Sequence, residues 1–388
     1  MSTTPTKDDR RTTEPAFVMP ENHLDLVVSP GSVDPGRRAS LRTTLITVIS
    51  MPVFFLVAFT LAFVSSAHAP VPHDMAITLA GPTATTDRLV DLIDEQAPGA
   101  FDVTVTTDAS RASEDVSTRA SVGSIVVDGT DVTTVVASGG GALAVPVVTQ
   151  LGQQVAAELG GTATLENVAP LPADDPGGSV LFFLLVICTV GAFLSITAVS
   201  QVLPAARTRS LVATAAGAAL IVPLLGFAVI SLFVDFEVPF GSVAAVLGVG
   251  AIYAFTVGLL ATLFTKLAGQ GGVLLVILFL IAVNFPSAGG SVPESMLPPF
   301  WQVVHNSWIG SGAFEQMRNI LFFGGDGSNR WLVQLLIWTA GSIVLLAAVT
   351  AVKKRRARPT PDAAEAEVEV EDRPIAADAG ARATPAGS

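Results

Sequence analysis

Residues 179–202 read SVLFFLLVICTVGAFLSITAVSQV and contain no Asp, Glu, His, Lys or Arg. As a helix, such a run can cross the ~30 Å hydrocarbon core of a bilayer, which takes about 20 residues. Further apolar runs occupy residues 41–65, 211–233, 242–265, 271–286 and 331–352. The sequence therefore predicts an α-helical polytopic membrane protein with about six transmembrane helices, the last five forming a membrane domain over residues 179–352.

The composition agrees with a lipid environment. Hydrophobic residues make up 50% of the 388 positions and charged residues only 14%, whereas soluble domains carry about 25% charged residues. Cys188 is the only cysteine, which excludes an internal disulfide and a Cys-based zinc site. Residues 1–36 and 353–388 show no apolar period, and we expect both to be disordered tails.

The first run, residues 41–65, has two interpretations. Ala67-His68-Ala69 resembles the small-residue cleavage site of a signal peptide. The run is, however, longer than the about 7–15 residues of a signal core, and a leader ending here would be unusually long. We expect an uncleaved membrane anchor, with a cleaved signal peptide as the alternative.

Basic residues indicate the orientation, because short cytoplasmic loops are enriched in Lys and Arg. If six spans alternate, one side receives Arg37, Arg38, Arg42, Arg207, Arg209, Lys266, Lys353, Lys354, Arg355, Arg356 and Arg358. The short loop on the opposite side contains Asp235 and Glu237. The pattern predicts that both termini, and with them both tails, are cytoplasmic.

Residues 70–177 separate the first two runs and are predicted to form an extracytoplasmic domain. The segment has 15 acidic and 3 basic residues, so its net charge of −12 equals that of the whole chain. Such a surface repels nucleic acid and anionic head groups, and we expect no nucleic-acid partner. The acidic residues fit a solvated surface better than an acidic ligand-binding face.

This segment has the pattern of a compact α+β domain. Strand-like alternation or β-branched content occurs at residues 75–79, 102–107, 124–128, 132–137 and 162–168. Asp128-Gly129 predicts a hairpin between the third and fourth strands. Thr85 and Thr86 can cap one helix, and a second is predicted over about 142–159. The apolar stripe of the second helix contains Leu143, Val147, Leu151, Val155 and Leu159. The expected order is β-α-β-(α)-β-β-α-β.

No catalytic motif is present. The chain lacks a Walker A sequence, GxSxG, HExxH and paired carboxylates in a catalytic setting, so we expect no enzyme activity and no cofactor in this chain. His68 and His73 are close in sequence, but such spacing is common by chance, and we assign no metal ligand. His305, between Trp301 and Trp308, fits an interfacial aromatic belt.

The second to sixth runs contain no Asp, Glu, His, Lys or Arg. Ion-coupled carriers usually need such residues or specialised broken-helix ion sites. Any uphill transport would therefore draw its energy from a partner, and a secondary carrier is the less favoured interpretation.

The connection over residues 286–330 contains a predicted short helix at Ala313–Phe323, and we expect it to pack against the outer mouth of the helices. Its sequences NFPSAGGSVP (284–293), LP (297–298) and MRNILFFG (317–324) resemble the ABC-2 type permeases of the YhgE/Pip-like branch. So does APLPADDPGG (169–178), before the second run. The architecture of one span, an outer domain and five spans is also similar, and the resemblance covers about residues 40–350.

The resemblance implies a bacterial plasma-membrane permease that forms a homo- or heterodimer in the lipid. It would export a hydrophobic or amphiphilic compound with ATP used by a separate cytoplasmic ATPase. In such permeases the loop between the second and third spans contacts the ATPase, here Pro204, Arg207 and Arg209. The loop before the last span lines the outer exit, here Asn284, Pro286, Ser287, Gly289, Gly290, Pro293, Pro298 and Trp301. The alternative is a non-transporting membrane scaffold or surface receptor that acts through its outer domain.

The orientation can be tested by labelling. Cysteines introduced at Asp131 and Ser311 should react with an impermeant thiol reagent in intact cells, because both positions are predicted to lie outside. Cysteines at Ser210 and Thr360 should stay unlabelled until the cells are opened. Labelling of either inner position in intact cells would overturn the predicted topology.

Overall fold

The computed structural model describes residues 41–203, 205–325 and 329–356. The chain divides into two compact units, residues 1–50 and 51–388, and the boundary falls inside helix α1 (Leu41–Ala67). The predicted tail 1–36 lies outside the described residues. Residues 357–388 of the other predicted tail also lie outside the described residues, whereas residues 353–356 are helical.

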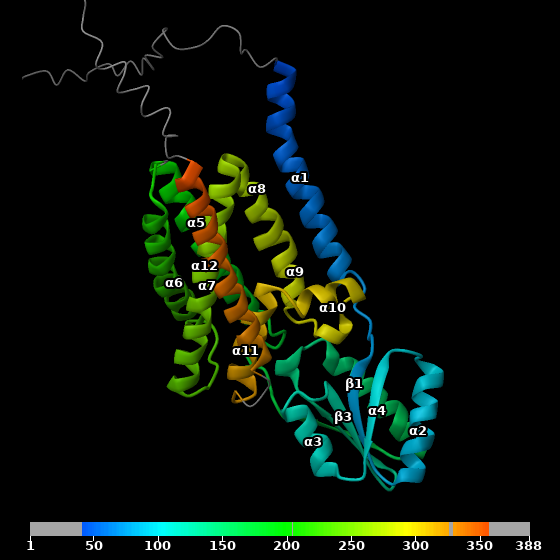
Figure 1. The fold of residues 1–388 in the computed structure, drawn as a ribbon. Coiled ribbons are helices and arrows are strands. Elements are labelled where there is room, and N and C mark those ends of the chain that lie inside the picture. Colours follow the sequence, from blue (N-terminus) through cyan, green and yellow to red (C-terminus); the bar gives the residue numbers. More distant parts are fainter. Residues whose placement is uncertain (1–40, 204, 326–328, 357–388) are drawn as a thin grey trace, which may run out of the picture. The chain divides into compact units, whose positions relative to one another are not determined.

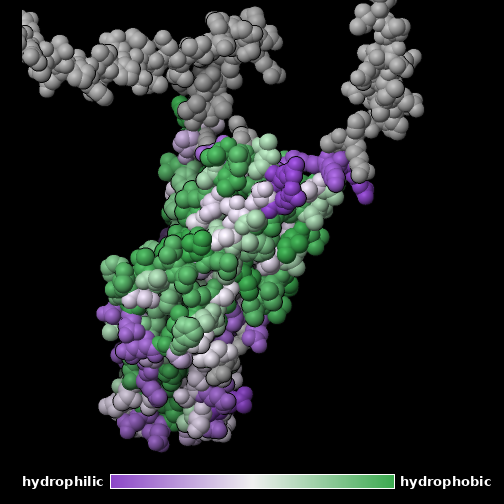
Figure 2. Space-filling view, turned by 90° about the vertical axis from the view of Figure 1, so that its left-hand side faces the viewer, coloured by the Kyte–Doolittle hydropathy of each residue, from purple (hydrophilic) through white to green (hydrophobic). Residues whose placement is uncertain are grey.

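Four helices in the described residues are long and apolar enough to cross a membrane: α5 (Val180–Val202), α6 (Thr208–Ile230), α7 (Phe240–Ala268) and α12 (Arg330–Arg356). They correspond to the second, third, fourth and sixth apolar runs (Figure 1). Large apolar side chains such as Leu220 and Ile337 stay exposed on them, and hydrophobic residues cover much of the face seen in Figure 2. Extensive exposed apolar surface of this kind is typical of contact with lipid. The chain is therefore a membrane-embedded protein.

Helix α7 is central to this group, because it packs against α5, α6 and α12. Small residues permit the close approach of α6. A Cβ added at Gly258 would lie only 2.7 Å from the Ala215 Cβ, and one at Gly250 would lie 3.1 Å from the Pro223 Cβ. Two glycines eight residues apart on one helix face thus set the distance between α6 and α7.

The first and fifth apolar runs contribute shorter apolar helices, Pro52–Ala67 within α1 and Gly272–Ala288. The second of these consists of α8 (Gly272–Val276), the π-helical segment η3 (Ile277–Val283) and α9 (Asn284–Ala288). A helix of this length extends for about 25 Å, less than the ~30 Å core. Pro286 interrupts the backbone ladder of α9 because it has no N–H to donate.

A small sheet region follows α1. Its strands are β1 (Met75–Ala80), β2 (Phe101–Thr106), β3 (Gly123–Asp128), β4 (Asp131–Val136) and β5 (Ala163–Asn167). Its helices are α2 (Thr83–Gln96), α3 (Ala109–Ser117) and α4 (Ala144–Leu159), with a 3-10 turn η1 (Ser138–Gly140). The strand order is β2-β1-β3-β4-β5, and only β3 and β4 are antiparallel neighbours. The predicted order of elements is confirmed, as is the hairpin, in which Gly129 has φ +64°.

The two faces of the sheet are covered differently. Helices α2 and α4 lie on one face, where Leu89 and Val148 pack with Ile77 and Ile125 of the sheet (Figure 1). Helix α3 lies on the other face. There Val116 joins a smaller apolar cluster with Val135, Ala137, Ala169 and Phe323. Phe323 comes from a segment that is distant in sequence, so the cover of the second face includes a residue from outside the sheet region.

Two details of the predicted helices are wrong. Helix α2 begins at Thr83, not at Thr85 or Thr86, and Thr86 is buried with its hydroxyl donating to the Thr83 carbonyl at 3.0 Å. In α4 the apolar stripe is rotated. Leu143 is exposed, whereas Ala144, Val148, Leu151 and Val155 are buried, because the sheet lies on that side.

Between α9 and α12 the chain forms η4 (Glu294–Met296), α10 (Pro299–His305) and α11 (Ile309–Phe322). Helix α11 begins at Ile309 rather than at Ala313, and it packs against α7, α9 and α12. Ser311 is buried, so a cysteine there would not react with an impermeant reagent. The exposed Ser307 is the suitable position to label in its place. His305 is also buried, which corrects its assignment to an interfacial belt.

The sheet region should fold without lipid. Residues 72–172, expressed as a soluble fragment, retain the apolar core that α2 and α4 form with the sheet. We expect cooperative thermal unfolding and a mixed α/β circular dichroism spectrum. The fragment lacks Phe323 and also Val292, Met296, Leu297 and Trp301, which join the core of α2, α4 and the sheet, so it should be less stable than the same region in the full chain. A random-coil spectrum would show that the region cannot fold alone.

Candidate functional site

A cavity of about 440 Å³ lies where the sheet region meets the connection between α9 and α12. Small-molecule sites commonly have volumes of about 300–1,000 Å³. The ionisable side chains that line the cavity are His73, Asp74, Arg119, Glu294, His305, Glu315, Arg318 and Arg330. This concentration of charge beside membrane-embedded helices makes the cavity the candidate functional site.

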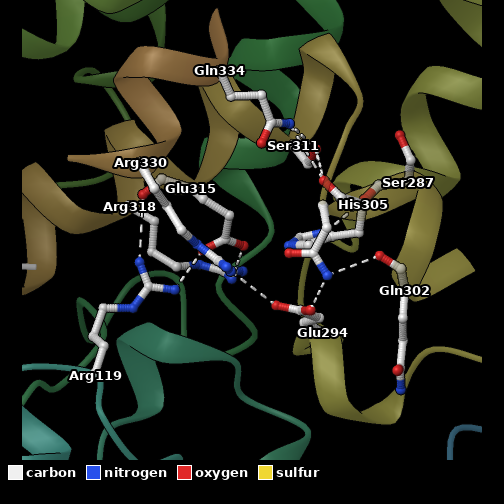
Figure 3. Close-up of polar contacts among 11 residues, drawn as sticks. Arg119, Ser287, Glu294, Gln302, His305, Ser311, Glu315, Arg318, Arg330 and Gln334 are labelled. Atoms are coloured by element: carbon white, nitrogen blue, oxygen red, sulfur yellow. Dashed lines mark hydrogen bonds and ion pairs between the residues drawn. The ribbon is translucent and has the colours of Figure 1, made fainter. Parts of the chain in front are cut away.

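The Glu315 carboxylate lies between two arginines (Figure 3). Its Oε1 is 2.5 Å from Nη1 of Arg318, which is on the same helix, and its Oε2 is 2.5 Å from Nη2 of Arg119. Arg318 also donates to the carbonyl of Gly290. The Glu315 and Arg318 side chains are only 3% and 4% exposed. Burial of charge at this depth requires such pairing. The cluster therefore joins the turn after α3 to α11.

Burial alone would raise the pKa of the Glu315 carboxyl, but the positive charges of Arg318 and Arg119 outweigh burial and lower it to about 2. Burial also lowers the pKa of the Arg318 guanidinium, to about 10, although Glu315 opposes this effect. Both groups are thus charged at neutral pH. Burial lowers the pKa of the His305 imidazole as well, so His305 is neutral there.

Arg119 adopts a backbone conformation that favours glycine. Its φ is +65°, and it directly follows Thr118, the C-cap of α3, where a left-handed residue commonly ends a helix. Its guanidinium Cζ lies 5.1 Å from the centroid of the Phe323 ring. Glycine would relieve the backbone at this position but would remove the ion pair with Glu315. The ion pair with Glu315, and not the backbone conformation of the turn, therefore explains why arginine occupies this position.

A second ion pair lines the more open side of the cavity. Arg330 Nη2 is 3.2 Å from Glu294 Oε2, and the Arg330 Cζ lies 4.0 Å from the centroid of the Trp331 ring. Asn306 also donates to Glu294. The Arg330 side chain is 54% exposed, so this pair faces solvent in a way that the Glu315 cluster does not.

Uncharged groups fix the helices around the cavity. The His305 Nδ1 is 2.7 Å from the carbonyl oxygen of Ser287. Ser311 donates to the carbonyls of His305 and Trp308, and Gln334 Nε2 donates to Trp308 at 2.5 Å. These bonds tie α10 and α11 to α9 and α12.

Several predicted outer-mouth residues are packed inside the protein. Asn284 and Pro286 are buried, and the Asn284 amide donates to the Tyr253 hydroxyl at 2.8 Å. Trp301 is buried and donates through Nε1 to the Ser65 hydroxyl at 3.0 Å. These residues pack the connection against α7 and α1.

Of the other predicted residues, one lines the cavity and two bond side chains that line it. Ser287 and Gly290 contribute carbonyl oxygens to His305 and Arg318, and Pro293 lines the wall. Gly289 and Gly290 have φ values of +80° and +62°, which other residues rarely adopt. Pro298 occupies the N-cap position of α10.

At the opposite end, basic residues from three chain segments come together. Lys266 donates to the Ala206 carbonyl at 3.1 Å, and Lys353 donates to the Lys266 carbonyl. Arg207 and Arg209 are exposed at the start of α6, whereas Pro204 lies outside the described residues. The expectation that these basic residues share one end of the helices is met for this group.

Sequence reasoning does not find the Glu315 cluster. The available signal is a pair of opposite charges, Glu315 and Arg318, three residues apart within an otherwise uncharged helix. Such a pair implies burial with an internal partner. The second partner, Arg119, cannot be identified from local pattern.

Comparisons of the chain with protein-family models, with curated proteins and with solved structures found no match. Within the described ranges, no group of three or more His, Cys, Asp or Glu side chains is arranged to hold a metal ion. The case for a function therefore rests on the geometry of this chain.

The variant Glu315→Gln should lower the free energy of unfolding by about 3–5 kcal/mol, because it leaves two arginines without a buried counter-charge. Glu158→Gln is the matched control, since its partner Arg88 is 72% exposed, and it should cost less than about 1 kcal/mol. Unfolding of the full chain in mixed micelles measures both. The Glu315 contribution is complete above about pH 4.5 and is lost as the pH falls toward 2, because the folded pKa is the lower one. Equal effects of the two variants would contradict the pairing.

Proposed function

We propose that this chain is the permease subunit of an ABC-2 type exporter that moves a hydrophobic or amphiphilic compound across a bacterial plasma membrane. In this proposal α1 and the segment 272–288 join the four long apolar helices as spans, and both termini are cytoplasmic. Two permeases, identical or different, form a dimer, and a separate cytoplasmic ATPase supplies the energy.

The uncharged interior of the long helices carries this proposal. Among the described residues, the buried polar side chains of α5, α6, α7 and α12 bear hydroxyl groups and no charge: Thr189, Tyr253, Thr256, Thr262 and Ser342. The Lys and Arg residues of these helices, such as Arg209, Lys266 and Lys353, lie at or near their ends. An ion-coupled carrier usually has titratable groups inside its bundle. Energy from a partner protein fits this interior better.

The basic end offers a surface for such a partner. Arg207 and Arg209 are exposed, and guanidinium groups form bidentate hydrogen bonds with carboxylates. The nearby contact between Lys266 and Ala206 ties this turn to the end of α7. A force applied at the turn would therefore act on two helices at once.

The exporter is tested by purification and reconstitution. The tagged chain is isolated from its native membrane in mild detergent, and an associated ATPase is identified. Both proteins are then placed in vesicles, and ATP-dependent movement of a fluorescent amphiphile is measured, with a Walker A variant of the ATPase as the inactive control. If no ATPase associates and no ATP-dependent movement occurs, the exporter is refuted and the scaffold or receptor alternative is favoured.

The contact turn has its own prediction. The double variant Arg207→Lys and Arg209→Lys keeps the positive charge that orients the chain but removes the planar fork of arginine. It should insert at the normal level and show reduced ATPase association. Arg88→Lys, an exposed arginine of the sheet region, serves as the control. Full association in the lysine variant, and in a correctly inserted double alanine variant, would exclude this turn as the contact.

A further inference from the structure

The Glu315 cluster has a surplus positive charge. Arg119 and Arg318 share one carboxylate, and the other partner of Arg318 is the neutral carbonyl of Gly290. Of the remaining acids at the cavity, Glu294 is held by Arg330 and Asn306, and Asp74 is exposed to solvent. Surface charge is screened over roughly 8 Å at physiological salt, whereas buried charge is screened much less. The buried cluster therefore favours an anion, although the three arginines of the cavity lining are matched in number by Asp74, Glu294 and Glu315.

An apolar groove begins beside this cavity. It has a volume of about 450 Å³, and Val333, Ile337 and Trp338 of α12 provide its apolar surface. Arg330 lines both the groove and the cavity. The two spaces thus adjoin at one guanidinium, which rests on the Trp331 ring. A compound with a charged head and an apolar chain would match the charged cavity and the apolar groove beside it.

We propose that the cavity and groove together bind an anionic amphiphile. Its oxyanion head group, a phosphate or a similar group, lies in the cavity near Arg119 and Arg330, and its hydrocarbon chain lies along Val333 and Ile337. Guanidinium groups suit this role because they bind oxyanions in a planar, bidentate manner. The role of this ligand as transported cargo rests on the proposed function, but the binding site itself does not.

Binding is measured by calorimetry with the full-length protein in a fixed concentration of dodecyl maltoside. Dodecyl phosphate is the probe, and inorganic phosphate and dodecyltrimethylammonium are the comparisons. The wild type should bind dodecyl phosphate more tightly than inorganic phosphate, because only the former has a chain for the groove. It should bind dodecyltrimethylammonium least.

The variants separate head from chain. Arg330→Gln and Arg119→Gln should each weaken dodecyl phosphate binding by about tenfold or more. Arg88→Gln, which removes an arginine remote from the cavity, should not. Ile337→Gln should weaken binding of dodecyl phosphate but leave that of inorganic phosphate unchanged. If Arg119→Gln does not fold, Arg330→Gln decides, since its side chain is half exposed and outside the Glu315 cluster.

Three results would overturn the proposal. In the first, the cavity variants bind dodecyl phosphate as tightly as Arg88→Gln does. In the second, inorganic phosphate binds as tightly as dodecyl phosphate, which would indicate a free anion instead of a head group. In the third, the cationic amphiphile binds as tightly as the anionic one.

None of these assays involves an ATPase, so intact binding without ATP-dependent transport would refute only the exporter. Lost binding with intact transport would refute only this site.

Discussion

A carboxylate removed from water has to be paired, and Glu315 meets this requirement with arginines from two distant parts of the chain. Arg318 lies one helical turn away on α11, whereas Arg119 is 196 positions away in sequence. The ion pair with Arg119 holds α11 to the turn after α3, and the pair with Arg318, inside α11, positions the carboxylate. The Phe323 ring lies under the Arg119 guanidinium and also belongs to the apolar cluster that covers one face of the sheet. Charged and apolar contacts therefore hold the same two elements together, and the cavity exists because they meet there.

Helix α11 is buried on almost every side although it is not uniformly apolar. Its close contact with α9 depends on Gly310, because a Cβ there would lie 2.4 Å from the Asn284 Oδ1. The Asn284 amide donates to Tyr253 of α7, and the Tyr253 hydroxyl shares a 2.6 Å hydrogen bond with Thr189 of α5. A line of uncharged polar contacts thus runs from α9, beside α11, into the interior of the long helices. Thr189 and Tyr253 are paired within this line, whereas the buried Asn284 Oδ1 has no hydrogen-bond partner among the described residues.

Elements that depend on local pattern could be predicted from the sequence. Alternation and the Asp128-Gly129 turn located all five strands to within one residue at either end. Hydropathy located α5, α6, α7 and α12. The candidate site could not be found in this way, because the pairing of Glu315 with Arg119 depends on the fold of the whole segment between them. The burial of His305 was missed for the same reason. Its ring packs against Trp331 and its Nδ1 meets the Ser287 carbonyl, neither of which is a sequence neighbour.

Helix α7 links the two charged ends of the molecule. Its last turn carries Lys266, which meets the turn before α6, and its middle carries Tyr253, which meets Asn284 beside α11. If the proposed ATPase moves the turn before α6, rigid helices in contact can carry the displacement to α11 without any charge inside the membrane. That path requires α6 and α7 to stay in close contact, which Gly250 and Gly258 permit. A larger residue at Gly258 would meet Ala215 and separate the two helices near the basic end, so the path would fail where the energy is proposed to enter. A scaffold or receptor that acts through the sheet region has no such dependence on the contact between α6 and α7.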